Sequence, residues 1–172
     1  RSNAWNNALV DTVRGGTKLI YSDANNSTGT FSDAITSFNS NGFTTGTNQF
    51  MNYNNSNTYA SWSFRKQKGF FDFVTYTGTG SNRTIDHNLG SVPGMILIKN
   101  LSTAGENWRC YHRSTTATQN QNFNLPDTFY TSSNDYNNTE PTSSVFSVGT
   151  DDGVNKSGDS YVAYIFAGGA ST

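Results

Sequence analysis

Residues Tyr161-Val-Ala-Tyr-Ile-Phe166 form a short apolar run that decides the fold of this chain. Aromatic and β-branched residues dominate the run, and Ser157-Gly158 before it suits a tight turn. A run of this length with such a boundary is typical of a β-strand. A second run, Met95-Ile-Leu-Ile98, is apolar at every position. Because both of its faces are apolar, we expect it in the middle of a packed sandwich.

Further strands are predicted along the whole chain, whereas helical periodicity is nearly absent. The clear candidates are residues 59–64, 70–76 and 108–111, and the weaker ones are residues 18–21, 43–45, 83–86, 122–125 and 145–148. Gly, Asn and Ser supply turn residues between the runs. Many short strands separated by turns predict an all-β fold, specifically an antiparallel, jelly-roll-like β-sandwich.

An internal sequence repeat is visible at a nearly constant spacing. Phe43-Thr-Thr-Gly-Thr47 resembles Phe146-Ser-Val-Gly-Thr150, and Tyr59-Ala-Ser-Trp-Ser-Phe64 resembles the opening run. The corresponding segments are 43–47 with 146–150, 51–52 with 154–155, 59–64 with 161–166, and Trp5 with Trp108. Four anchors in the same order are hard to obtain by chance, even in a chain of biased composition.

The two copies in this repeat are unequal. Residues 69–172 hold one complete β-sandwich unit, whereas residues 1–68 match only the second half of a unit. Since Trp5 lies close to Arg1, we expect the chain to begin partway through a longer repeat array. A half unit does not easily bury a core alone, so the first part should pack against the complete unit or another chain.

Composition places this chain among folded proteins with a neutral, polar surface. Of its 172 residues 33% are hydrophobic and 13% charged, both below the usual averages of about 45–50% and about 25%. Twelve Phe, nine Tyr and three Trp residues can still fill a core. A net charge of −1 argues against nucleic acid as a partner. The apolar runs are too short to insert in a membrane as a helix, and one cysteine, Cys110, forms no internal disulfide.

Three long motifs resemble a repeat module of tail-fibre and other virion surface proteins of tailed phages, particularly marine ones. They are Phe64-Arg-Lys-Gln-Lys-Gly-Phe-Phe-Asp-Phe-Val-Thr-Tyr-Thr-Gly78, Thr84-Ile-Asp-His-Asn-Leu-Gly-Ser-Val-Pro-Gly-Met-Ile96 and Trp108-Arg-Cys-Tyr-His-Arg113. The resemblance continues through residues 142–149 and 161–167. It implies a structural protein of the virion, located on the virion or outside the cell, that assembles with other virion proteins and with copies of itself.

The resemblance brings no catalytic motif, and we expect neither an enzyme nor a cofactor. In phage fibres a homo-oligomer is the usual state and trimers are the commonest case, with a host-surface glycan as a further partner. One alternative is a secreted carbohydrate-binding lectin or adhesin. The other is a glycan depolymerase, which needs two carboxyl groups roughly 5–10 Å apart. The carboxylates that could serve are Asp72, Asp86, Glu106, Asp127, Asp135 and Glu140.

The histidines and the aspartates near residue 151 have simpler interpretations than catalysis or metal binding. His87 and His112 are interpreted as hydrogen-bonded residues at strand ends. Residues 151–159, Asp-Asp-Gly-Val-Asn-Lys-Ser-Gly-Asp, could form a calcium loop, but their spacing departs from known loops and a polar hairpin explains them. We therefore predict no metal site.

Aromatic side chains are the candidates for stacking on sugar rings. Because the repeat places Trp5 opposite Trp108 and Trp62 opposite Tyr164, these positions are predicted to lie in the core. Residues 127–140 are loop-like and rich in Asn and Ser, and loops are the usual place for surface ligand sites. The predicted ligand-binding residues are those of this loop: Tyr130, Asp135, Tyr136 and Asn137.

Overall fold

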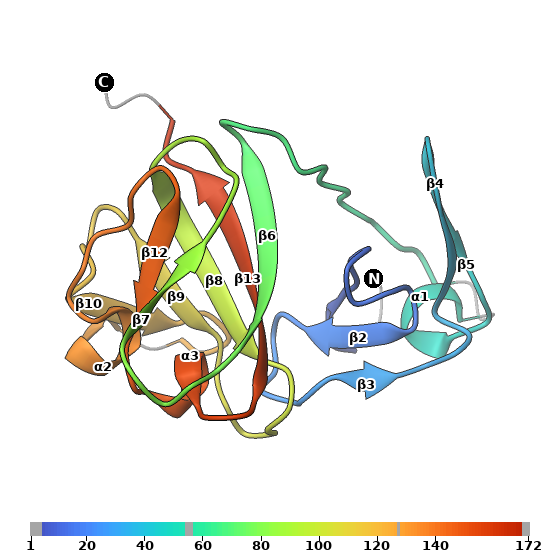
Figure 1. The fold of residues 1–172 in the computed structure, drawn as a ribbon. Coiled ribbons are helices and arrows are strands. Elements are labelled where there is room, and N and C mark those ends of the chain that lie inside the picture. The colour runs from blue at the N-terminus through green and yellow to red at the C-terminus, as the bar shows by residue number, and fades with distance from the viewer. Residues whose placement is uncertain (1–4, 54–56, 127, 170–172) are drawn as a thin grey trace.

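A six-stranded antiparallel sheet forms the centre of the fold (Figure 1). The structure is a computed structural model, which describes residues 5–53, 57–126 and 128–169. The strands of this sheet are, in spatial order, β11 (Tyr130–Thr131), β10 (Gln119–Asn122), β9 (Arg109–His112), β8 (Pro93–Asn100), β13 (Ser160–Ala167) and β6 (Phe71–Thr77). Strand β13 contains the run 161–166 and pairs with β6 along one edge and with β8 along the other.

One face of this sheet packs against a two-stranded sheet of β7 (Arg83–Asp86) and β12 (Val145–Val148). The helices α2 (Ser133–Tyr136) and α3 (Asp152–Asn155) are short and lie beside it. Ile85 and Phe146 of the small sheet share a buried cluster with Ile96, Ile98 and Ile165 of the large sheet. The first core therefore lies between two antiparallel sheets.

The opposite face of the large sheet is covered by the beginning of the chain. Strands β1 (Ala8–Leu9), β2 (Lys18–Tyr21) and β3 (Gly29–Thr30) form a separate three-stranded sheet. Its Ile20 shares a second buried cluster with Trp108 and Val162. The Trp108 indole, only 1% exposed, donates a hydrogen bond to the Tyr21 carbonyl over 2.8 Å. Both faces of the large sheet are thus shielded from water.

A polar contact adds to this apolar packing between the two sheets. The Tyr164 hydroxyl donates to a carboxylate oxygen of Asp11 over 2.9 Å and accepts from the Arg14 guanidinium over 3.1 Å. Arg14 also forms an ion pair with Asp11, and both side chains are almost fully buried. Because each polar group has a partner, burying the cluster does not leave an unpaired charge.

The rest of the first part lies away from the large sheet (Figure 1). Strands β4 (Ile35–Asn39) and β5 (Gly42–Thr45) form a hairpin, and helix α1 (Gln49–Asn52) follows it. Residues 57–66 then run to β6 without belonging to any strand. Within residues 5–53, 57–126 and 128–169, no helix is long and apolar enough to cross a membrane.

The predicted all-β, antiparallel fold is confirmed. Strands are found with the predicted bounds at residues 18–21, 83–86 and 145–148, and Met95–Ile98 lies inside β8 with apolar contacts on both faces. The jelly-roll-like sandwich, the repeat and the division at residues 68 and 69 stay predictions.

Three strand and core predictions are wrong. The strand at 122–125 lies instead at 119–122. Residues 59–64 form no strand, since no neighbouring strand in the described residues pairs with them. Trp62 is consequently 81% exposed and Trp5 40% exposed, whereas Trp108 and Tyr164 lie in the core as predicted.

The two tryptophans Trp108 and Trp62 should differ sharply in their effect on stability. We expect Trp108→Ala to lower the free energy of unfolding by about 3–5 kcal/mol, because it removes a fully buried ring and leaves a cavity. Trp62→Ala, the matched control, should change it by less than about 0.5 kcal/mol. Urea unfolding followed by circular dichroism measures both, and equal losses would contradict this assignment of the core.

Candidate functional site

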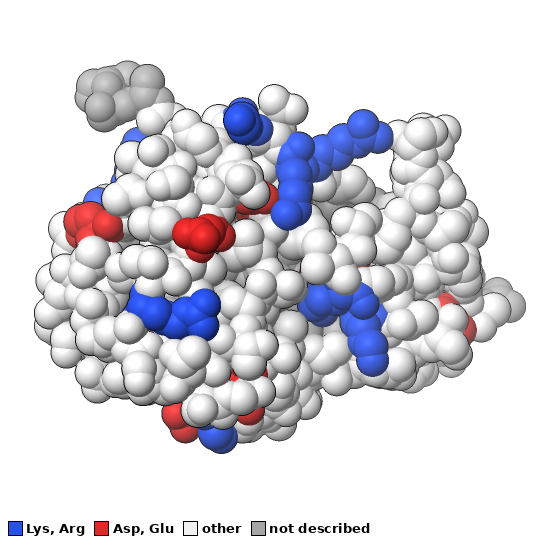
Figure 2. All heavy atoms as spheres, in the orientation of Figure 1, with Lys and Arg blue, Asp and Glu red and all other residues white. Residues whose placement is uncertain are grey.

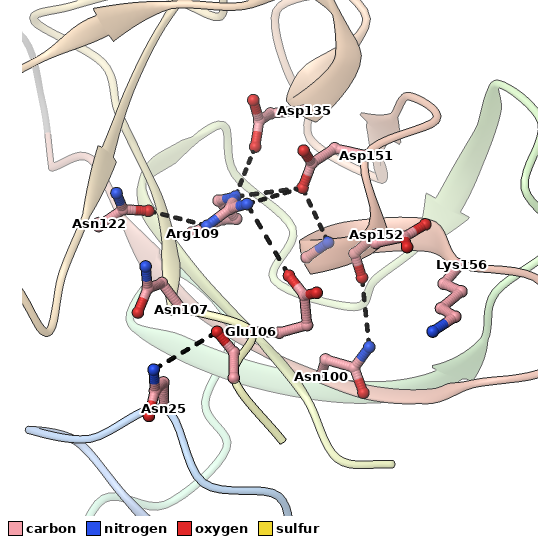
Figure 3. A network of polar contacts seen from close by, with 12 residues as sticks. Asn25, Asn100, Glu106, Asn107, Arg109, Asn122, Asp135, Asp151, Asp152 and Lys156 are labelled. Carbon is pink, nitrogen blue, oxygen red and sulfur yellow. Dashed lines mark hydrogen bonds and ion pairs between the residues drawn. The ribbon is translucent and has the colours of Figure 1, made fainter. Parts of the chain in front are cut away.

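Arg109 is the centre of the densest polar network in the molecule (Figure 3). Its Nε donates to Asp135 Oδ1 over 2.9 Å, its Nη1 to Asn122 Oδ1 over 2.8 Å and its Nη2 to Asp151 Oδ1 over 2.9 Å. Glu106 lies 4.0 Å from the same guanidinium. Figure 3 shows these side chains converging on Arg109 from separate elements.

Local structure positions each partner of Arg109. Asp151 is the N-cap of α3, and its Oδ1 also accepts from the Gly153 amide over 2.8 Å. A Cβ on Gly153 would lie 2.8 Å from the Arg109 guanidinium carbon, so a side chain at this position would displace the guanidinium from its partners. Asp135 belongs to α2, and Asn122 ends β10. One guanidinium therefore joins β9 and β10 to both helices.

The electrostatics of the network indicate a role in holding the fold together. Asp135 is completely buried, and burial raises the pKa of its carboxyl although the Arg109 charge and a Ser132 hydrogen bond oppose the rise. Its Oδ2 has no hydrogen-bond partner among the described atoms. Arg109 is partly buried, with 13% of its side chain exposed, and it pairs with the buried Asp135 and the more exposed Asp151. Loss of the arginine would leave the Asp135 carboxylate buried without its counter-charge, which is strongly destabilising.

The four residues predicted to bind a ligand are placed in different surroundings. Asp135 takes part in the Arg109 network, and the Tyr130 hydroxyl lies 3.5 Å from its Oδ1. Tyr136 is 2% exposed, packs edge-on against Tyr111 in the first core and donates a hydrogen bond to the Arg109 carbonyl. Asn137 ends α2 with a left-handed φ of 51°, and its Oδ1 accepts from the side-chain Nδ2 of Asn82. The structure brings Tyr130 and Asp135 together, and it does not gather all four on one surface.

The segment 151–159 uses its aspartates for internal hydrogen bonds. The buried Asn100 side chain donates to the Asp152 carbonyl and to Asp159 Oδ2, over 3.2 and 2.9 Å. Hydrogen bonds from Thr103 and Asn100 lower the pKa of Asp159. In the described part of the chain, no group of three or more His, Cys, Asp and Glu side chains is arranged to hold a metal ion.

The remaining catalytic candidates serve local structure. His87 is buried, burial lowers the pKa of its imidazole, and its Nδ1 accepts from the Leu89 amide. His112 is exposed and its Nδ1 lies 2.6 Å from the Ser114 hydroxyl within one turn. Glu140 accepts from the Tyr111 hydroxyl, and Asp72 accepts from the Asn88 amide. Asp127 lies outside the described residues.

Lys99 is a buried charge that the sequence did not single out. It is fully buried in β8, and its Nζ donates to the carbonyls of Asn100 and Glu106, both over 2.9 Å. Burial lowers the pKa of its ammonium group to about 8, an effect that the Glu106 carboxylate opposes and the Arg109 charge reinforces. Because burial shifts its pKa, Lys99 is a source of pH-dependent stability.

A family model described as "Domain of unknown function (DUF7483)" matches residues 1–170. The chain therefore belongs to this family. No curated protein and no solved structure matches it.

Removal of the central arginine should be costly. We expect Arg109→Met to lower the free energy of unfolding by about 3–5 kcal/mol, because Asp135 then stays buried without its counter-charge. Chemical denaturation measures the loss. The double variant Arg109→Met with Asp135→Asn also removes the unpaired Asp135 charge, so it should recover part of the lost free energy of unfolding. If the double variant is no more stable than Arg109→Met, the two residues do not act as a pair.

The buried lysine should give stability a distinct pH dependence. Its folded pKa lies below its unfolded value, so Lys99 binds more protons in the unfolded chain and its contribution to stability rises with pH between about 8 and 10. Burial raises the pKa of Cys110 and of Tyr161, and these groups lower stability as the pH rises through the same window. We therefore expect the free energy of unfolding of the wild type, relative to that of Lys99→Met, to rise by ~1–2 kcal/mol across this window, measured by urea unfolding at several pH values. A difference between the two proteins that does not change with pH would contradict this role of Lys99.

Proposed function

We propose that this chain is a structural module of a phage virion appendage, either a tail fibre or a surface decoration. In this role it assembles with copies of itself and with other virion proteins, and contributes to attachment to the host surface. The resemblance of its motifs to virion surface modules is one support. The other support is a group of exposed apolar side chains at one end of the large sheet.

This group, here the end patch, consists of the phenylalanines Phe64, Phe70 and Phe166, with Val92 at the same end of the sheet, where its carbonyl accepts from the Gly168 amide. Phe64, Phe70 and Val92 are each at least half exposed. The Phe64 ring lies 6.3 Å from that of Phe70 and 5.9 Å from that of Phe166, measured between centroids. Exposed apolar groups that gather in one place mark interaction sites in soluble proteins. The end patch is the observation that carries the proposal of assembly.

The charged side chains on the face in Figure 2 are too few and too scattered to drive association by long-range electrostatic attraction. Figure 2 shows a face that is mostly uncharged, with Lys, Arg, Asp and Glu side chains scattered over it. Strand β6 forms an edge of the large sheet, and contacts within the chain already occupy much of that edge. Gln67 pairs with Phe71, and the Lys66 ammonium group donates to the Phe73 carbonyl. A neighbouring copy would therefore cover the apolar side chains of the end patch rather than this edge.

Glycan binding, as in a secreted lectin or adhesin, is the second candidate function. Trp62 favours it, because 81% of this side chain is exposed and an open indole face can stack on a sugar ring. Exposed Tyr53 and Tyr59 lie in the same part of the chain. The two candidates differ in oligomeric state and in sugar binding, which makes them separable.

Light scattering on the purified chain tests the assembly. We expect a molar mass several times the 18.8 kDa of one chain, with three copies as the commonest arrangement of such fibres. Phe70→Ser with Val92→Ser should shift the mass toward one chain, because hydroxyl groups replace the apolar contact of the end patch. Val13→Ser is the matched control: Val13 is 55% exposed but lies outside the end patch, so its replacement should leave the mass unchanged.

Two outcomes would contradict the proposed function. A chain that stays monomeric at tens of micromolar and binds sugars in a titration is a lectin. Release of reducing ends from host polysaccharides over time indicates a depolymerase.

A further inference from the structure

Strands β1, β2 and β3 pair with one another in the same register as β9, β10 and β11, displaced by 101 positions. Lys18 pairs with Thr30 between β2 and β3, as Gln119 pairs with Thr131 between β10 and β11. The amide of Ser22 donates to the Asn7 carbonyl, as that of Phe123 donates to the Trp108 carbonyl. In this register Asn7, and not Trp5, corresponds to Trp108.

The pattern continues through helices α1 and α3, now displaced by 103 positions. Asn48 caps α1 and Asp151 caps α3, each accepting from the amide two residues later. A Cβ on Gly46 would lie 2.3 Å from the Asp33 carbonyl oxygen, and one on Gly149 would lie 2.2 Å from that of Asn134. Both glycines are needed for the same close approach of two backbone segments.

A tyrosine hydroxyl contacts each of these helices in the same way. Tyr161 donates to the Asp152 carbonyl and accepts from the Lys156 amide, both over 2.7 Å. Tyr59 contacts the Gln49 carbonyl over 3.5 Å and accepts from the Tyr53 amide over 3.0 Å. Residues 59–64 are therefore placed relative to α1 as the first residues of β13 are placed relative to α3.

The first half, residues 7–66, and the second half, residues 69–169, differ in the strands that lie next to their corresponding segments. Strand β9 has β8 beside it, and β13 lies between β6 and β8. In the first half β1 is a sheet edge and residues 60–64 belong to no strand. Exposure follows: Tyr59 is 38% exposed where Tyr161 is 0%, and Phe43 is 37% exposed where Phe146 is 1%. The first half thus corresponds to the complete unit with the strands equivalent to β6, β7 and β8 missing.

We propose that residues 7–66 are an incomplete copy of the unit, and that they bind a β-strand segment with the pattern of residues 70–100. One strand of that segment pairs with β1, as β8 pairs with β9. Residues 59–64 then form a strand between two of its strands, as β13 does between β6 and β8. This interaction surface is separate from the end-patch contact of the proposed assembly, apart from Phe64.

The first half also specifies the chemistry of this segment. It needs strands whose backbone is open for antiparallel pairing and whose side chains are apolar on the inner face. Ser61 and Ser63 stand where Ala163 and Ile165 are buried, so bulky side chains are needed opposite them. A second copy of this chain is a poor donor, because its residues 70–100 already pair with its own β9 and β13.

A fusion tests the proposal by supplying the missing strands. A duplicate of residues 68–107 is joined ahead of Asn7, so that the added segment precedes the first half as the original precedes Trp108. We expect the fluorescence of Trp62 to shift to shorter wavelength, and amide exchange of residues 60–64 to slow by at least ~100-fold as they form strand hydrogen bonds. The unfused chain provides the reference for both measurements.

The control fusion carries Leu97→Pro in the added segment alone, because proline removes a ladder hydrogen bond from a central strand. In this control, the fluorescence wavelength of Trp62 and the amide exchange rates of residues 60–64 should be the same as in the unfused chain. Fast exchange at residues 60–64 in the intact fusion would overturn the proposal. So would concentration-dependent protection of these amides in the unfused chain, because a second copy would then supply the strands.

Discussion

Strand β13 has buried side chains on both faces, and this constraint shapes the rest of the fold. Ala163 and Ile165 face one core, whereas Val162 and Tyr164 face the other. A strand of this kind is stable only in the middle of a sheet with a cover on each side. The β7–β12 sheet covers one face and the first three-stranded sheet covers the other. The Trp108 and Tyr164 contacts to residues 11–21 follow from this need, because without the first sheet both aromatic side chains would meet water.

Period-two patterns and turn residues predicted the strands of the second half well. Residues 83–86 and 145–148 form strands with the predicted bounds and pair with each other in an antiparallel ladder. The strand predicted at residues 122–125 was wrong. The strand at this place is β10, the polar run Gln119–Asn122, which forms through backbone pairing and has no apolar pattern in its sequence. Residues 59–64 have a good strand pattern and form no strand. A strand needs a neighbour as well as a pattern, and the sequence of one segment does not show whether its neighbour is present.

The Arg109 network lay beyond prediction for a different reason. Asp135 and Asp151 lie 26 and 42 positions after Arg109, and only the fold brings the three side chains together. Aspartates near turns are ordinary in a chain rich in polar turn residues, so neither stood out as the partner of a partly buried arginine. Asp135 was instead predicted to contact a ligand at the surface, whereas it is completely buried. The network ties the two helices to the sheet.

Two segments of similar sequence, Tyr59–Phe64 and Tyr161–Phe166, isolate the effect of surroundings on structure. Each places a tyrosine hydroxyl on a short helix in the same way, so the local sequence acts alike in both. Residues 161–166 pair with a strand on each edge and are largely buried. Residues 59–64 pair with no strand of the described residues, so Trp62 is exposed to water, whereas Tyr164 at the corresponding position is only 7% exposed. The proposal that residues 7–66 receive strands from elsewhere accounts for this difference, since added neighbours would give residues 59–64 the pairing that β13 has on its two edges.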